Sequence, residues 1–287
     1  MRKFLYLLGI IVTLLFLVKN SYAQNMIQIK GSDTMVNLGQ AWAESFMKKH
    51  PEAFIAVTGG GSGTGIASLL NKTCDIAECS RKMKQKEIEL AHKKGINPVE
   101  FTVALDGLAV VVHPANPVDK LTIDQLADIF TGKITNWKEF GGKDSKIVIL
   151  SREVNSGTHV YFKEHVLRRN NPNNKDEFAH SALLMPSSQA IADEVSGNPQ
   201  AIGYYGMGYI SPSQKAVVVA KDNNSPYVLP TIENVVDGKY AVSRPLFIYT
   251  DGVPQGVVKE FLDFVLSDEG QKIVLDIDFV PVKPVKE

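Results

Sequence analysis

The sequence contains few cysteines and no excess of either charge, and each scarcity excludes a class of protein. Two cysteines cannot build a disulfide scaffold or a four-cysteine zinc site. Lysine plus arginine (31) balances aspartate plus glutamate (31), so the chain has no overall field that would hold nucleic acid or an anionic membrane. Any anion that it binds must be held by local geometry, and we expect no nucleic-acid partner.

Common enzyme motifs are also missing. The segment from Gly60 to Gly65 has the glycine spacing of a P-loop, but Ile66 stands where that motif needs lysine. The nucleophile-elbow pattern fails around Ser62, because Thr64 replaces its second glycine. The six histidines show no zinc-protease spacing. These chemistries therefore fit the sequence poorly, and we expect no metal and no cofactor.

The N-terminus has the pattern of a secretory signal peptide. Arg2 and Lys3 precede an uncharged, mostly apolar run from Phe4 to Val18. As a helix at ~1.5 Å per residue this run reaches ~22 Å, which is short of the ~30 Å hydrocarbon core of a bilayer. Ser21 to Ala23 fits a small-x-small cleavage site. We predict that residues 1–23 are removed and that the product is soluble and exported; a retained membrane anchor is the alternative.

The cysteines Cys74 and Cys79 are separated by a segment predicted to be a strand. Five extended residues span ~16 Å, well beyond the reach of a disulfide. An oxidising compartment would permit a bond, but we expect two buried free thiols.

Strand and helix patterns alternate along the rest of the chain, and no repeat of fixed period is present. This alternation predicts a mostly parallel sheet with helices on both faces, in one large or two modest domains. The long apolar run from Val99 to His113 is broken by Asp106-Gly107. The expected strands are Met26–Lys30, Ala53–Thr58, Asp75–Glu78, Ile147–Leu150, Ala201–Tyr205, Ala216–Ala220 and Pro245–Thr250. The expected helices are one through Leu38 and Phe46 that ends at Pro51, a short one through Ile66 and Leu70, Gln85–Lys94, Thr122 to near Phe130, Ser156 toward Leu167, Ser188–Ser196, and two within Gly256–Ile277.

Three short clusters of serine, threonine and glycine each follow a predicted strand and precede a predicted helix. They are Gly31-Ser32-Asp33-Thr34, Gly61-Ser62-Gly63-Thr64 and Asn155-Ser156-Gly157-Thr158. A helix N-terminus presents unpaired backbone N–H groups and the positive end of the helix dipole, and hydroxyls add short neutral donors. Each cluster alone could be an ordinary helix cap. Together they predict a site for a small tetrahedral anion at the carboxyl ends of the strands.

Two arginines lie next to these clusters. Arg81 follows Ser80 after the strand that begins at Asp75, and Arg152 ends the strand just before the third cluster. A guanidinium offers a planar fork to an oxyanion. We therefore add Ser80, Arg81 and Arg152 to the candidate site.

An anion that carries a proton also needs an acceptor, which a carboxylate can supply. Asp33 is the first choice because it lies inside the first cluster, and Asp106 is the second. Asp75 is more readily explained as a structural residue. His159 follows the third cluster directly, and we expect it on a helix surface rather than in a cleft.

In order and spacing these motifs resemble the substrate-binding proteins of the phosphate-specific ABC transporter, over essentially the whole mature chain. The matching segments are Lys30–Met35, Gly59–Gly65, Asp75–Ala77 with Ser80-Arg81, Asp106-Gly107 with Val110–Pro114, Trp137, Arg152 with Ser156–Thr158, Gly203-Tyr204, Ser243–Leu246 and Leu266–Gln271. Single motifs are weak, whereas their order and spacing together are specific.

The resemblance implies an α/β, two-lobed periplasmic-binding-protein fold (type II). Each lobe would hold a mixed, mostly parallel sheet flanked by helices, and two crossing segments would join the lobes. Residues 24–112 and 221–287 would form lobe 1, and residues 113–220 lobe 2. The ligands implied by the family pattern are Ser32, Thr34, Ser62, Arg152, Ser156, Gly157 and Thr158. Some family members carry an acidic residue where this chain has Ser80-Arg81, so here the proton acceptor must come from elsewhere.

The expected function is high-affinity binding of inorganic phosphate in the periplasm and delivery to a membrane permease driven by an ATPase. A monomer suits this mechanism. The alternatives are a binding protein for sulfate or another tetrahedral oxyanion, and an exported phosphatase; a sensor docked to a membrane kinase also stays open.

Overall fold

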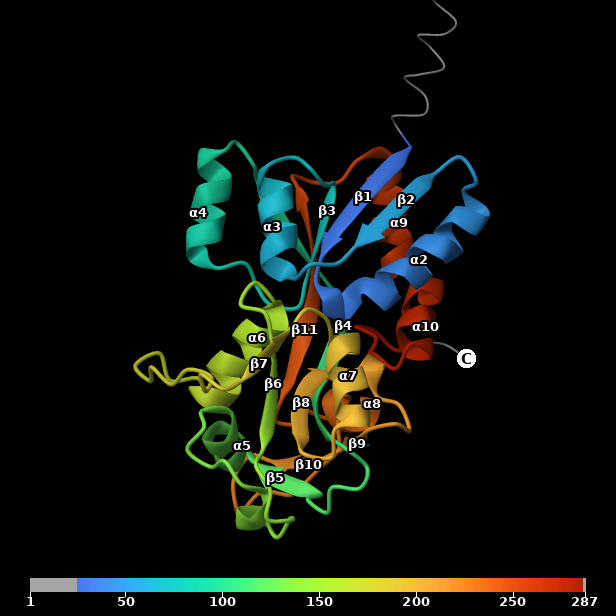
Figure 1. Ribbon diagram of the computed structural model, residues 1–287. Coiled ribbons are helices and arrows are strands. Elements are labelled where there is room, and N and C mark those ends of the chain that lie inside the picture. The colour runs from blue at the N-terminus through green and yellow to red at the C-terminus, as the bar shows by residue number, and fades with distance from the viewer. Residues whose placement is uncertain (1–24, 286–287) are drawn as a thin grey trace, which may run out of the picture.

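The computed structural model describes residues 25–285, so the predicted signal peptide lies outside the described residues. Figure 1 shows two lobes, one above the other, with strands β4 (Pro98–Val112) and β11 (Ser243–Asp251) running through the junction between them. The fold is the two-lobed α/β type II architecture that the sequence predicts. Within residues 25–285, no helix is both long and apolar enough to cross a bilayer.

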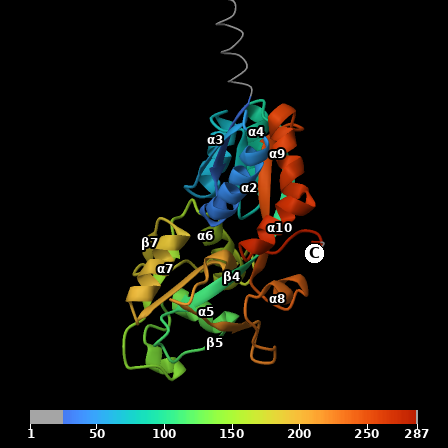
Figure 2. The same cartoon turned by 90° about the vertical axis from the view of Figure 1, so that its right-hand side faces the viewer.

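One lobe is built around the parallel strands β1, β2 and β3, which alternate with helices. Their bounds are Met26–Gly31 for β1, Phe54–Thr58 for β2, Ile76–Cys79 for β3, Val36–Lys49 for α2, Ser62–Leu70 for α3, Gln85–Lys93 for α4, Gly256–Leu266 for α9 and Asp268–Asp276 for α10. A short 3-10 turn, Asp33–Met35, precedes α2. Helices α2, α9 and α10 contribute to the core on one face of the sheet, and α3 and α4 to the core on the other (Figure 2).

The second lobe repeats this layered plan around the parallel strands β6, β7 and β8. Their bounds are Val148–Arg152 for β6, Leu183–Met185 for β7, Ala201–Gly206 for β8, Ile123–Phe130 for α5, Gly157–Phe162 for α6 and Ser188–Gly197 for α7. Helix α6 continues as a π-helical segment to Leu167. Thr122 and Gln125 form the capping box that starts α5, as the sequence predicts. The remaining short elements are β5 (Lys120–Thr122), β9 (Lys215–Ala216), β10 (Val218–Ala220), α8 (Ile232–Val236) and the 3-10 turns Trp137–Phe140 and Met207–Tyr209.

Among the described residues, one continuous sheet runs through both lobes. Its strand order is β2-β1-β3-β11-β4-β8-β6-β7, and β9 pairs with β4. Strands β11 and β4 are antiparallel to each other, whereas the pairs inside each lobe, β1 with β2 and β3, and β6 with β7 and β8, are parallel. One cluster of buried apolar side chains includes residues of both lobes. The boundaries given above for the lobes, 24–112, 113–220 and 221–287, stay predictions.

Strand β4 runs unbroken from Pro98 to Val112, so the Asp106-Gly107 pair that breaks the apolar pattern does not break the strand. Its first part pairs with β11 up to Gly107, and from Leu108 onward it pairs with β8. A buried aspartate is tolerated in mid-strand because an arginine of β11 pairs with it. Gly107 is required for space, since a Cβ there would lie 2.9 Å from a methyl carbon of Val235.

Cys74 and Cys79 are both buried and not bonded to each other, in agreement with the spacing of the sequence. Burial raises the pKa of the Cys74 thiol to about 12, and it raises the pKa of Cys79 further. Such thiols stay protonated at neutral pH and are poor nucleophiles.

Candidate anion-binding site

Three serines from the first lobe meet where its parallel strands end. Ser32 follows β1, Ser62 opens α3 after β2, and Ser80 follows β3; all three are buried. Ser32 Oγ donates to Ser80 Oγ at 2.9 Å, and Ser62 Oγ lies 3.3 Å from Ser80 Oγ. The backbone N–H of Ser80 also donates to Ser62 Oγ at 3.0 Å. The first lobe thus presents a compact group of hydroxyls at the carboxyl edge of its sheet.

The second lobe presents the N-terminus of α6 to these serines. Ser156 caps the helix, because its Oγ accepts from the backbone N–H groups of Thr158 at 3.2 Å and His159 at 3.4 Å. Gly157 allows the lobes to approach closely, since a Cβ at this position would lie 2.2 Å from Ser62 Oγ and 2.6 Å from Ser80 Oγ.

The lobes contact each other directly through a pair of threonines. Thr34 Oγ1 of the first lobe and Thr158 Oγ1 of the second are 2.8 Å apart and buried. We call the group Ser32, Thr34, Ser62, Ser80 and Thr158 the hydroxyl cluster. Beside it Asn155 Nδ2 donates to Gly60 O at 2.8 Å, a further contact between the lobes.

Arg152 lies at the edge of this cluster and is 1% exposed. Its guanidinium is held by three acceptors of the second lobe, namely Met185 O at 3.3 Å, Pro186 O at 3.0 Å and Ser188 Oγ at 3.1 Å. Asp33 Oδ2 of the first lobe lies 3.1 Å from Arg152 Nη2. Burial lowers the pKa of Arg152 and the Asp33 carboxylate opposes that shift. The ion pair therefore joins the two lobes.

A second buried arginine, Arg244 of β11, was not among the predicted ligands. Its Nε and Nη2 donate to Asp106 Oδ2 at 3.0 and 2.8 Å. Its Nη2 also lies 3.0 Å from Thr158 Oγ1 and 3.4 Å from Thr34 Oγ1. Two signals in the sequence could have found it: a charged residue beside the apolar run Pro245–Tyr249, and its place in the segment Ser243–Leu246 that matches the family pattern.

Both candidate acceptor carboxylates are already engaged. Asp33 Oδ2 faces Arg152 and also accepts from the backbone N–H of Ser188 at 2.9 Å. Asp106 Oδ1 accepts from the backbone N–H of Met207 at 3.0 Å, and Oδ2 faces Arg244. The structure therefore brings both aspartates beside the cluster, but each carboxylate is committed to an arginine.

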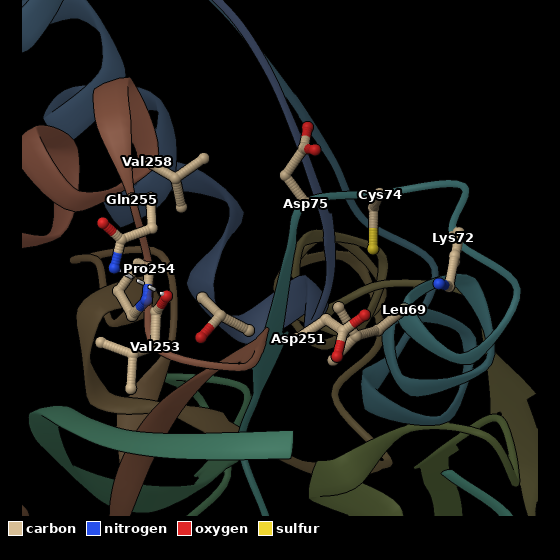
Figure 3. A pocket seen from close by; sticks show the side chains of 10 residues that line it. Leu69, Lys72, Cys74, Asp75, Asp251, Val253, Pro254, Gln255 and Val258 are labelled. Atoms are coloured by element: carbon tan, nitrogen blue, oxygen red, sulfur yellow. Dashed lines mark hydrogen bonds between the residues drawn. The ribbon is translucent and has the colours of Figure 1, made fainter. Parts of the chain in front are cut away.

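Asp75 lies elsewhere, at the other end of β3. Its Oδ2 accepts from the backbone N–H of Gln28 at 2.7 Å. Figure 3 shows it in the wall of a cavity of about 350 Å³, with Cys74 and Asp251 nearby. This placement agrees with a structural role.

Arg81 is also turned away from the cluster. Its two terminal nitrogens bind the Glu87 carboxylate at 2.8 and 2.7 Å, in the first turn of α4. No hydrogen bond among the described residues joins Arg81 to a cluster hydroxyl. The structure thus places Ser80 in the cluster and its neighbour Arg81 outside it.

The expected surface position of His159 is wrong. The side chain is 4% exposed, and its Nδ1 lies 2.8 Å from Arg152 O and 3.2 Å from Ser151 Oγ. Burial lowers its pKa to about 4. His159 fixes the start of α6 against the end of β6, because it binds the carbonyl oxygen of Arg152.

The chain is similar to several known proteins over most of its length. The model of the PBP superfamily domain matches residues 19–269. The phosphate-binding protein PstS of Bacillus subtilis is 34% identical over 268 residues, which cover 92% of this chain and 83% of the relative. A Clostridium perfringens structure, described as a phosphate ABC transporter substrate-binding protein with bound phosphate, superposes with a TM-score of 0.81 at 37% identity and covers 90% of this chain and all of that one.

The chain belongs to the phosphate-binding protein family of ABC transporters. A second structural relative, an ABC-type phosphate transport receptor from Vibrio cholerae, has a TM-score of 0.70 and 34% identity, and covers 90% of this chain and all of that one. The resemblance seen in the sequence is confirmed. Phosphate-binding proteins of this family are substrate-binding proteins rather than enzymes, and they are secreted, either periplasmic or extracellular.

Proposed function

We propose that this phosphate-binding protein holds inorganic phosphate between its lobes and delivers it to an ABC importer. The observation that carries the proposal is the buried meeting of hydroxyls from both lobes, with Thr34 and Thr158 in direct contact. Ser62, Ser80 and the N-terminus of α6 adjoin that contact. These groups are the hydroxyls and backbone amides that suit a small oxyanion.

The proposed mechanism is closure of the lobes around the anion. Hydroxyls that bond to one another in this structure would donate to the oxygens of phosphate instead. The start of α6 would add the backbone N–H group of Gly157, because those of Thr158 and His159 donate to Ser156 Oγ. Because contacts from two lobes are needed at once, the anion stabilises the closed form over the open form.

Selectivity would depend on hydroxyls, because both nearby carboxylates are engaged by arginines. A serine hydroxyl can accept a hydrogen bond from the protonated oxygen of hydrogen phosphate and can equally donate to an unprotonated oxygen. Ser80, which lies at the centre of the serine contacts, is our candidate for this role. A site without a free carboxylate repels sulfate less strongly than a site with one.

The same proposal includes the location of the protein, its oligomeric state and its membrane partner. The protein would act in the periplasm after removal of residues 1–23, as a monomer that docks on a membrane permease with its ATPase. It would catalyse no reaction itself. Support comes from the family relation and from the signal-peptide pattern of Arg2 to Ala23.

Calorimetric titration of the mature protein with phosphate, alone and in the presence of sulfate or arsenate, tests the proposal. We expect saturable binding of one phosphate per chain, with measurable competition by sulfate. Preference for sulfate over phosphate would instead support the alternative of a binding protein for sulfate. A phosphatase assay on the same preparation should show no turnover of a phosphate monoester, and metal-independent turnover would contradict the binding-only function.

A further inference from the structure

Arg244 lies where the two crossing strands meet. It is on β11, opposite Asp106 of β4 in the antiparallel register, and its side chain is 1% exposed. The Asp106 carboxylate binds Nε and Nη2, and the ring of Tyr161 lies 5.4 Å from the guanidinium carbon. The guanidinium is therefore held in one position by groups on both sides.

The same guanidinium contacts the anion-binding hydroxyls of both lobes. Nη2 donates to Thr158 Oγ1 at 3.0 Å and lies 3.4 Å from Thr34 Oγ1. In this structure the two hydroxyls also share a hydrogen bond with each other. A threonine oxygen that accepts from a guanidinium keeps its own hydrogen free for an acceptor, and the positive charge strengthens that donor.

The remaining nitrogen, Nη1, is buried and has no hydrogen-bond partner. A buried guanidinium nitrogen can only donate, so its partner must be an acceptor. Arg152 differs, because each of its nitrogens already meets an acceptor of the protein. Among the described residues, Arg81 Nε is the other arginine nitrogen that is buried without a hydrogen-bond partner. Arg81 lies outside the hydroxyl cluster and binds Glu87.

We propose that Arg244 is an anion ligand, with Nη1 donating to the phosphate while Nη2 orients the Thr34 and Thr158 hydroxyls. Arg152, by contrast, has an acceptor for each of its side-chain nitrogens in this structure and faces Asp33 of the other lobe. This inference rests on the proposed function and deepens it, because it names a ligand that the motif pattern does not supply. Since the guanidinium touches one hydroxyl from each lobe, it links anion binding to closure.

The competing explanation is that Arg244 only neutralises the buried Asp106. The double variant Arg244→Gln with Asp106→Asn separates the two, because it removes both charges together and leaves no buried carboxylate unpaired. The matched control is Arg81→Gln with Glu87→Gln, which removes an ion pair of the same chemistry away from the cluster. All proteins are titrated with inorganic phosphate by calorimetry after their folding is checked by thermal unfolding.

We expect the Arg244 double variant to bind phosphate roughly 10- to 100-fold more weakly, which is the range for losing a hydrogen bond to a charged group. The Arg81 control should stay within about twofold of the unsubstituted chain. Equal affinity of the Arg244 double variant and the unsubstituted chain would overturn the inference. Failure of the unsubstituted chain itself to bind phosphate would instead contradict the proposed function, and the inference with it.

If the double variant does not fold, Arg244→Lys provides the second test. Lysine keeps the charge beside Asp106 but cannot donate to the threonines and the anion at the same time. We expect a loss of phosphate affinity of at least about tenfold with little change in thermal stability. Unchanged affinity in the lysine variant would show that the charge alone is needed and would overturn a role for Nη1.

Discussion

At the scale of single residues, the proposed anion site consists mainly of hydroxyls. Both arginines near the cluster have carboxylate partners, and Arg244 Nη1 is the one nitrogen of the two side chains that has no hydrogen-bond partner among the described residues. Thr158 is the clearest case, because its hydroxyl meets both the other lobe and Arg244.

Thr158→Val should therefore weaken phosphate binding roughly tenfold or more while the fold persists, since the variant removes one donor and keeps the shape. Thr131→Val is the matched control, because the Thr131 hydroxyl binds only carbonyl oxygens of its own helix. Titration calorimetry of both variants measures the difference. Equal affinities would remove Thr158 from the site.

Glu78 is a second residue with a testable consequence. It is fully buried in β3, neither carboxyl oxygen has a hydrogen-bond partner, and burial raises its pKa well above the usual range. The unfolded chain ionises this group above about pH 4.5 while the folded chain keeps it protonated, so Glu78 destabilises the fold increasingly as the pH rises.

Glu78→Gln should consequently raise the free energy of unfolding at pH 7.5, by on the order of 1–3 kcal/mol, and have little effect near pH 4. Urea unfolding at the two pH values measures this, with the exposed Glu260→Gln as control. A loss of stability at pH 7.5 would show that the ionised form is favoured in the fold.

At the scale of elements, the start of α6 carries the contact between the lobes. Gly157 is needed there because any larger residue meets Ser62 and Ser80. Gly157→Ala should hold the lobes apart and weaken phosphate binding at least about tenfold, since donors from the two lobes can no longer converge. Gly197→Ala, at the end of α7 with open space around it, should bind like the unsubstituted chain. Calorimetry that finds the two alanine variants alike would contradict this account of closure.

His159 makes the same element sensitive to acid. Its pKa is lowered by burial to about 4, against about 6.5 in the unfolded chain. The stability that depends on the neutral imidazole is fully present above pH 6.5 and is lost as the pH falls toward 4. His159→Asn, which can keep a donor for Arg152 O, should show a smaller loss of unfolding free energy between pH 6.5 and 4, as followed by urea titration. Identical pH profiles would mean that other groups account for the acid sensitivity.

At the scale of the whole molecule, the sequence predicts what local chemistry determines. The three serine- and threonine-rich clusters lie at the starts of helices as predicted, and in the third of them the Ser156 side chain caps the helix. The continuity of β4 and the position of Arg244 could not be predicted from local sequence. Both depend on the pairing of Asp106 with an arginine 138 residues away, and only the folded sheet brings the two together.

The crossing strands also predict how the molecule responds to its ligand. Strands β4 and β11 join the lobes (Figure 1). The lobes meet again at the hydroxyl cluster, where Thr34 contacts Thr158. Phosphate should reduce the radius of gyration in solution scattering, because it favours the closed arrangement. A saturating excess of about 100 times the Kd should stabilise the fold by about 2.7 kcal/mol. Scattering that does not change with phosphate would indicate that the lobes are already closed without it.

A crystal structure of the mature protein grown with phosphate tests the central claim most directly. We predict one phosphate between the ends of β1, β2 and β3 and the start of α6, within hydrogen-bond distance of Ser62, Gly157 and Thr158. A phosphate bound only elsewhere, or a hydroxyl cluster that stays closed on itself with phosphate in large excess, would contradict the account.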